Sequence, residues 1–184
     1  CDAFESFLLA IGLRRAQIDE VKAACQARRR YRSPELLQRA HAISLNHQVP
    51  LVIHVSETEN EVQQSLKDKG RTPVAYLADL GVLSPNLLAC HCVVLAPGDV
   101  DLLKKFDVKV AHNPESNMKL ASGIAPVPEM IGAGICVGLG TDGCASNNNL
   151  DLFSEMDTAA KLHKVHLLDP TVMDAATVAT LSTI

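Results

Sequence analysis

Four short apolar runs, rich in β-branched residues, recur along the chain and predict four buried β-strands. They cover residues 51–55, 87–93, 108–112 and 135–140. Apolar runs as short and continuous as these are typical of parallel strands that are covered by helices on both faces. We therefore expect a parallel sheet that lies inside a layer of helices.

Helical patterns fill the intervals between these runs. They predict helices over residues 34–47, 57–69, 73–80, 97–106, 127–132, 150–163 and 171–182, with a further helical pattern over residues 2–25. Ser33 and Pro34 are typical of a helix N-cap followed by a first-turn proline. Gly70 is expected to interrupt the connection between the first two strands, so that it forms two helices.

The C-terminal third carries two helix predictions of its own. Phe153, Met156 and Ala160 share one face of the helix over 150–163, which predicts an apolar stripe. Asp169-Pro170 is expected to cap the last helix. The alternation of strands and helices predicts an α/β fold of parallel β/α units, and both an open doubly wound sheet and a (β/α)8 barrel fit it. No strand is followed by the glycine-rich fingerprints that bind nucleotides in open sheets.

Composition and charge exclude several classes of function. The chain has 184 residues, a net charge of −4 and only 3% aromatic residues, which argues against a nucleic-acid-binding protein. Its longest uncharged stretch, residues 80–98, contains two prolines and a histidine and predicts no membrane span. The six cysteines form no CxxC pair, and several lie in apolar runs. We therefore expect reduced cysteines and a cytoplasmic protein.

Polar side chains mark the end of each predicted strand. His54 and Glu57 follow the first strand, His91 ends the second, His112 ends the third, and Asp142 follows the fourth. Each alone has a structural explanation, such as a satisfied histidine, a first-turn acid or an Asp-Gly turn. In a barrel, however, the carboxyl ends of the strands converge on one site. Four such endings in succession favour a shared site, in which His and Asp are plausible metal ligands and Glu a proton carrier.

Four longer segments resemble the metal-dependent amidohydrolase superfamily. They are residues 51–61 (LVIHVSETENE), 89–92 (ACHC), 111–126 (AHNPESNMKLASGIAP) and 137–155 (VGLGTDGCASNNNLDLFSE). The resemblance is to the branch that contains 5-methylthioadenosine/S-adenosylhomocysteine deaminases, chlorohydrolases and cytosine-deaminase relatives, and it spans residues 33–184. It implies that the four β/α units are strands five to eight of a TIM-type (β/α)8 barrel, a partial barrel.

The resemblance also implies a role for each polar residue. His54 would be a metal ligand, Glu57 the acid and base, His91 the group that polarises the attacking water or the substrate, and Asp142 both ligand and proton acceptor. Glu57 and His91 would also touch the substrate. The loop that follows the third strand would lie beside the substrate as well, or hold its own shape through side-chain to backbone hydrogen bonds; its residues are Asn113, Ser116 and Asn117.

The implied reaction is hydrolytic deamination of an adenine-type nucleoside. The cofactor would be one divalent metal, zinc or alternatively iron, which activates water at neutral pH. Guanine deaminase and chlorohydrolase activities are the alternatives within the family. If the site is shared, the ligating atoms of His54 and Asp142 should lie about 3–4 Å apart, because zinc lies ~2.0–2.2 Å from each ligand. Glu57 and His91 should then line the same cleft.

One part of the family pattern is missing from the sequence. The metal site of the family also takes an HxH pair from the first barrel strand, and no HxH occurs in this chain. Residues 33–184 therefore resemble the C-terminal half of an amidohydrolase, preceded by a helical segment, residues 1–32, of undetermined origin. The isolated chain is expected to be inactive. It could be a fragment, one of two complementary chains, or a catalytically silent half-barrel that binds partners or assembles with itself as a homo-oligomer.

Overall fold

The computed structural model describes residues 33–183 and divides the chain into two compact units, residues 1–51 and 52–184. The predicted helices of residues 1–32 lie outside the described residues. In the first unit, helix α3 (Pro34–His47) begins as the sequence predicts, because the Ser33 hydroxyl accepts the Leu36 N–H and Pro34 occupies the first turn. It ends at Gln48, whose φ of 53° is left-handed.

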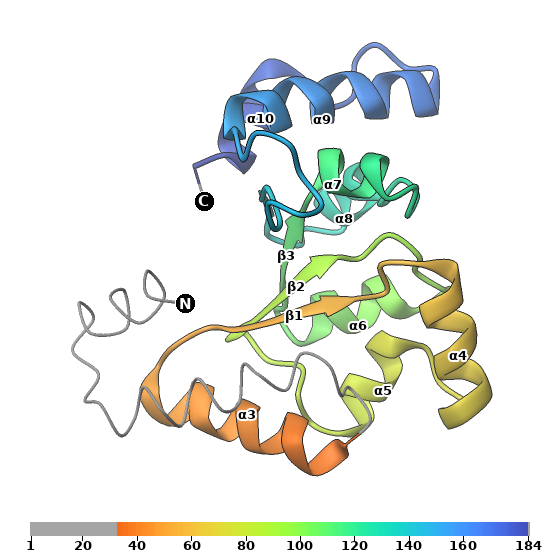
Figure 1. Ribbon diagram of the computed structural model, residues 1–184, viewed down its shortest axis with the longest axis vertical. Helices are drawn as coiled ribbons and strands as arrows, with labels where there is room; N and C mark the ends of the chain where they lie inside the picture. The colour runs from red at the N-terminus through yellow and green to blue at the C-terminus, as the bar shows by residue number, and fades with distance from the viewer. Residues whose placement is uncertain (1–32, 184) are drawn as a thin grey trace. The chain divides into compact units, whose positions relative to one another are not determined.

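The second unit is built on a four-stranded sheet in the order β1-β2-β3-β4 (Figure 1). The strands are β1 (Leu51–Val55), β2 (Leu87–His91), β3 (Lys109–His112) and β4 (Val137–Leu139). Ala89 pairs with Val110 and Ala111 pairs with Gly138, both in parallel register. All four strands lie within the predicted apolar runs, and the parallel α/β prediction is confirmed.

Helices follow each strand, as β/α units require. They are α4 (Glu59–Lys69), α5 (Pro73–Asp79), α6 (Asp99–Lys105), α7 (Pro114–Lys119), α8 (Val127–Gly132), α9 (Leu152–Leu167) and α10 (Ala175–Leu181). Helix α5 packs against α4 and α6, while α8, α9 and α10 pack against β4. Val55, Leu87, Val110 and Val137 from the strands are buried in the core. The strands thus fill the core with apolar side chains, and the polar residues predicted for the site lie at their carboxyl ends.

Four helices, α4, α6, α9 and α10, begin two to four residues later than the sequence predicted, and the caps of two of them show why. Helix α4 begins at Glu59 rather than at residue 57, because the side chain of Thr58 accepts the Glu61 N–H and forms the N-cap. Helix α10 begins at Ala175 rather than at residue 171, because Asp174 caps it. Both caps satisfy a backbone N–H of the first helical turn. The N-cap of each of these two helices therefore lies further along the chain than the sequence pattern indicated.

The predicted apolar face of α9 was wrong. Phe153 is 80% exposed, and the buried positions are instead Glu155, Ala159 and His163, spaced four residues apart. Two of these three are polar, so a hydrophobicity pattern could not identify them. Burial is tolerated because both polar side chains have hydrogen-bond partners from other parts of the fold.

The cysteines and helices agree with the expectations drawn from composition. Cys90 and Cys92 are buried, and Cys136 and Cys144 are also reduced, so the described cysteines form no disulfide. No helix of residues 33–183 combines the length and apolarity needed to cross a membrane.

Candidate metal centre

The ends of the strands share an unusual backbone conformation. Ser56, His91 and Asp142 have φ values of 53°, 74° and 58°, in the left-handed region that side chains other than glycine rarely adopt. Such residues persist where the surrounding structure holds them, and they gather at functional sites. Three of them follow β1, β2 and β4 at the same end of the sheet, which marks this end as the candidate site.

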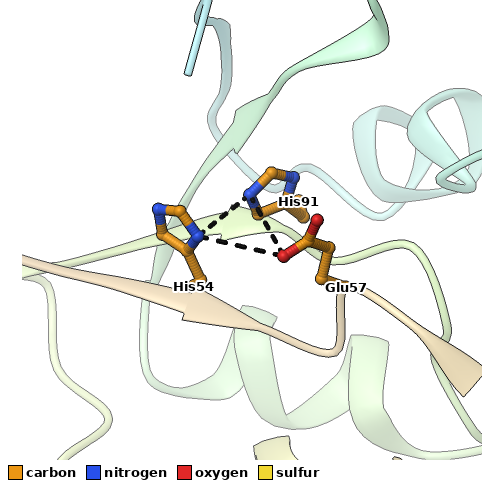
Figure 2. A group of neighbouring side chains, drawn as sticks. All are labelled: His54, Glu57 and His91. Carbon is orange, nitrogen blue, oxygen red and sulfur yellow. Dashed lines mark hydrogen bonds and ion pairs between the residues drawn. The ribbon is translucent and has the colours of Figure 1, made fainter. Parts of the chain in front are cut away.

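His54, Glu57 and His91 converge at this end of the sheet (Figure 2). His54 Nδ1 lies 3.2 Å from His91 Nε2, and the two rings meet edge to face. Glu57 Oε2 lies 3.9 Å from His54 Nδ1 and 3.8 Å from His91 Nε2. The three ligand-type atoms therefore lie within 4.8 Å of one another. His91 is fully buried, whereas His54 and Glu57 remain partly exposed.

Asp142 approaches the opposite edge of the His54 ring. Its Oδ1 lies 3.7 Å from His54 Nε2, within the 3–4 Å expected for two ligands of one metal. Its Oδ2 accepts hydrogen bonds from the hydroxyls of Ser116 at 2.8 Å and Ser146 at 2.5 Å. Partial burial opposes ionisation of this carboxyl, but the two hydroxyls and the nearby histidines outweigh it and lower the pKa of Asp142. The carboxylate form is thus favoured.

The segment after β3 is a helix and not the expected loop. Ser116 and Asn117 lie in α7, where both are buried. Ser116 holds Asp142, and the side-chain oxygen of Asn117 lies 2.8 Å from His91 Nδ1. The side-chain amide of Asn113, oriented by its surroundings, donates to the backbone carbonyls of His112 and Gly140 at 3.3 and 3.2 Å. All three residues therefore support the site from behind, and their contact with a substrate stays a prediction.

Glu57 is held in place by residues that sequence reasoning missed. The carboxylate of Glu61 turns back from the first turn of α4 and accepts the backbone N–H groups of Ser56 and Glu57. The hydroxyl of Ser122 donates to Glu57 Oε1 at 3.3 Å. The spacing of Thr58 and Glu61 is that of a capping box, a sequence signal that could have identified this support. Glu57 therefore precedes helix α4. The purely structural explanation, in which Glu57 is an acid in the first turn of that helix, does not apply.

A second layer of buried polar groups holds the segment that carries Asp142. Asn147 donates to the Thr141 carbonyl at 3.0 Å and to Glu155 Oε1 at 2.5 Å. Glu155, fully buried in α9, also accepts the backbone N–H of Glu115 at 3.1 Å. These contacts link α7, α9 and the loop after β4. Nothing local in the sequence indicates them, because Glu115 and Glu155 are 40 positions apart.

Gly140 is required by close packing just before Asp142. A methyl group at this position would lie 2.7 Å from the amide of Asn113, closer than real contacts allow. We expect Gly140→Ala to lower the free energy of unfolding by about 1–3 kcal/mol, measured by urea denaturation. Gly143→Ala is the matched control, since a methyl group there meets nothing within 4 Å. Equal effects of the two variants would contradict the packing argument.

The donor set fits a divalent transition metal. Imidazole nitrogen and carboxylate oxygen are ligands of zinc and of its first-row neighbours. His54 presents one ring nitrogen to Asp142 and the other to His91 and Glu57. The distance from His54 Nε2 to Asp142 Oδ1 would allow these two residues to share an ion, and their role as metal ligands stays a prediction.

Parallel β/α units with histidines and carboxylates at the strand ends define part of a β/α barrel with a candidate metal site. The chain belongs to the amidohydrolase family, whose model matches residues 21–184. It is 61% identical over 151 residues to the 5-methylthioadenosine/S-adenosylhomocysteine deaminase of Syntrophobacter fumaroxidans, which covers 82% of this chain and 34% of that protein. It is 51% identical over 152 residues to the 5'-deoxyadenosine deaminase of Methanothermobacter thermautotrophicus, covering 83% and 36%.

Solved structures show the same fold. An adenosine deaminase from Xanthomonas campestris with bound zinc matches with a TM-score of 0.78 at 39% identity, over 82% of this chain and 34% of that one. Atrazine chlorohydrolase from Arthrobacter aurescens, complexed with zinc, matches with a TM-score of 0.76 at 26% identity, over 82% and 33%. The four β/α units thus form part of an amidohydrolase barrel. The chain spans about a third of the length of the curated relatives it matches.

Proposed function

We propose that the chain forms part of a hydrolytic deaminase of adenine-type nucleosides, of the methylthioadenosine and S-adenosylhomocysteine class. The observation that carries the proposal is the convergence of His54, Glu57, His91 and Asp142 at one end of the sheet. The substrate class comes from similarity, because two close relatives carry the names of deaminases of such nucleosides. The substrate would be a small purine nucleoside or a related heterocycle.

His54 and Asp142 would hold the metal, which we propose to be zinc, with iron as the alternative. When bound, the metal activates a water molecule for attack on the ring carbon that bears the amino group. The two protein ligands are fewer than the three of a usual catalytic zinc site. We therefore expect the 184-residue chain alone to lack turnover and to need the HxH-bearing part of a barrel.

The side chains divide the proton transfers between them. Asp142 would accept a proton from the water, because the hydroxyls of Ser116 and Ser146 favour its ionised, proton-free form. Glu57, partly exposed beside the two histidines, would pass one proton of the water to the ring nitrogen. The second proton, taken up by Asp142, would return through Glu57 to the departing amine, which leaves as ammonia. His91 would polarise the attacking water by accepting one of its protons in a hydrogen bond at Nε2. The net change is replacement of the ring amine by oxygen from water.

A chimera tests the proposed function. Residues 33–184 would replace the matched segment of the Syntrophobacter fumaroxidans relative, and ammonia release would be measured with methylthioadenosine, S-adenosylhomocysteine, 5'-deoxyadenosine and guanine. Chloride release from a chlorotriazine would test the chlorohydrolase alternative. We expect ammonia from the adenine-type substrates, and loss of activity after chelation that zinc restores. A folded, zinc-loaded chimera that releases neither product would contradict the proposal.

A further inference from the structure

Three side chains, Asn117 in α7, His91 and His54, contact one another in sequence and lead from α7 to the candidate metal site. The Asn117 side-chain oxygen lies 2.8 Å from His91 Nδ1, and His91 Nε2 lies 3.2 Å from His54 Nδ1. The far nitrogen of His54, Nε2, faces Asp142 at 3.7 Å. Asn117 is 1% exposed and His91 is fully buried, so water does not compete for the contact between these two residues. Each contact is within hydrogen-bonding distance up to His54.

The chemistry of the first member fixes the direction of every proton in the line. In the orientation in which the Asn117 oxygen faces His91, that oxygen only accepts, so His91 carries its proton on Nδ1. The Nε2 of a neutral His91 is then an acceptor, and the contact at 3.2 Å requires a proton on His54 Nδ1. A neutral imidazole carries one proton only. The Nε2 of His54 therefore presents its lone pair toward Asp142.

We propose that Asn117 is a positioning residue that sets the tautomers of both histidines, so that His54 offers an unprotonated Nε2 to the metal. This inference rests on the proposed function for its metal, but not for the protonation pattern. It assigns to Asn117 a role different from the substrate contact that the sequence suggested. Metal-bound histidines commonly depend on such a partner at the other ring nitrogen, since it fixes both tautomer and orientation.

The remaining contacts of Asn117 support this role. The Asn117 side-chain nitrogen is buried and has no hydrogen-bond partner among the described residues. Only the oxygen end is used, and it is used on His91. The reverse amide orientation would present an N–H to His91 Nδ1, move the His91 proton to Nε2 and make His54 Nδ1 the acceptor.

Nitrogen NMR tests the protonation pattern without metal. Long-range proton–nitrogen spectra of the 15N-labelled, metal-free 184-residue chain distinguish protonated from unprotonated ring nitrogens, and the variants His54→Gln and His91→Gln assign the signals. We expect a proton on Nδ1 of both rings and none on Nε2 at a pH where both rings are neutral. A proton on Nε2 of either ring would overturn the proposal. This readout needs only the wild-type chain and its assignment variants.

The variant Asn117→Leu tests the role of Asn117 itself, because it removes the acceptor at nearly constant volume. We expect His91 to lose its preference for protonation at Nδ1, and the zinc Kd, measured by chelator competition, to rise roughly 10- to 100-fold. Met118→Leu, at an exposed neighbouring position of α7, is the matched control and should change neither. An unchanged tautomer pattern and Kd in Asn117→Leu would overturn the proposal, and if this variant does not fold, the wild-type spectrum decides.

The two readouts also separate this inference from the proposed function. The predicted protonation pattern, together with a folded chimera that binds no zinc, would support the role of Asn117 and contradict the proposed function. Zinc binding, together with a proton on His54 Nε2 in the metal-free chain, would contradict the role of Asn117 and leave the proposed function supported.

Discussion

Asp142→Asn is expected to reduce turnover of the chimera by roughly 10²- to 10⁴-fold through loss of the proton acceptor alone. An amide carries no charge for a metal and takes up no proton at neutral pH, so two functions of Asp142 disappear together. The side-chain oxygen that remains can still accept from Ser116 and Ser146. We therefore expect the free energy of unfolding to change by no more than about 1 kcal/mol, measured by urea denaturation beside the ammonia assay.

The matched control for this variant is Asp101→Asn, at an exposed position on α6. It makes the same chemical change and should leave both turnover and stability near those of the parent. Turnover within threefold of the parent in Asp142→Asn would show that Asp142 neither holds the metal nor accepts the proton. If Asp142→Asn lost activity because it unfolds, the midpoint of its urea denaturation would fall well below that of the parent.

The strands and most helices could be predicted because their signals are local. A short apolar run or a cap such as Ser33 is read within a few positions, and β1 and α3 match their predicted ranges. The candidate site could also be assembled, because the endings of β1, β2 and β4 carry polar groups that the parallel topology brings together, whereas His112 at the end of β3 contacts His163 instead. The distance between His54 and Asp142 follows from this topology.

The supporting residues could not be predicted because their partners are remote in sequence. His112 contacts His163 across 51 positions, and Glu155 contacts Glu115 across 40. Their burial reverses the hydrophobic pattern of α9, where Phe153 is exposed and polar residues face inward. Tertiary hydrogen bonds, rather than hydrophobicity, decide which face of this helix is buried.

The buried pair His112 and His163 is expected to make the fold sensitive to acid. Their Nε2 atoms lie 3.2 Å apart, and both residues are almost fully buried. Burial, together with His163 and His91, lowers the pKa of His112 to about 3. Burial, together with His166, lowers the pKa of His163 to about 4. The unfolded chain, with ordinary histidine pKa values near 6.5, therefore binds more protons than the folded chain as the pH falls below that value.

Stability should thus fall with decreasing pH below about 6.5, by roughly 1 kcal/mol per pH unit for each histidine, down to its folded pKa. The variants His163→Gln and His112→Gln each remove one titrating ring and keep a polar side chain, so each should flatten the slope of unfolding free energy against pH by about that amount. His47→Gln, in α3 and outside the buried pair, is the matched control.

Burial also raises the pKa of Glu155, which is fully buried in α9, and this stabilises the fold as the pH falls. That contribution is common to wild type and variants, so the difference between their slopes isolates the histidines. Parallel slopes for His163→Gln and wild type between pH 6.5 and 4 would show that the pair is not held neutral.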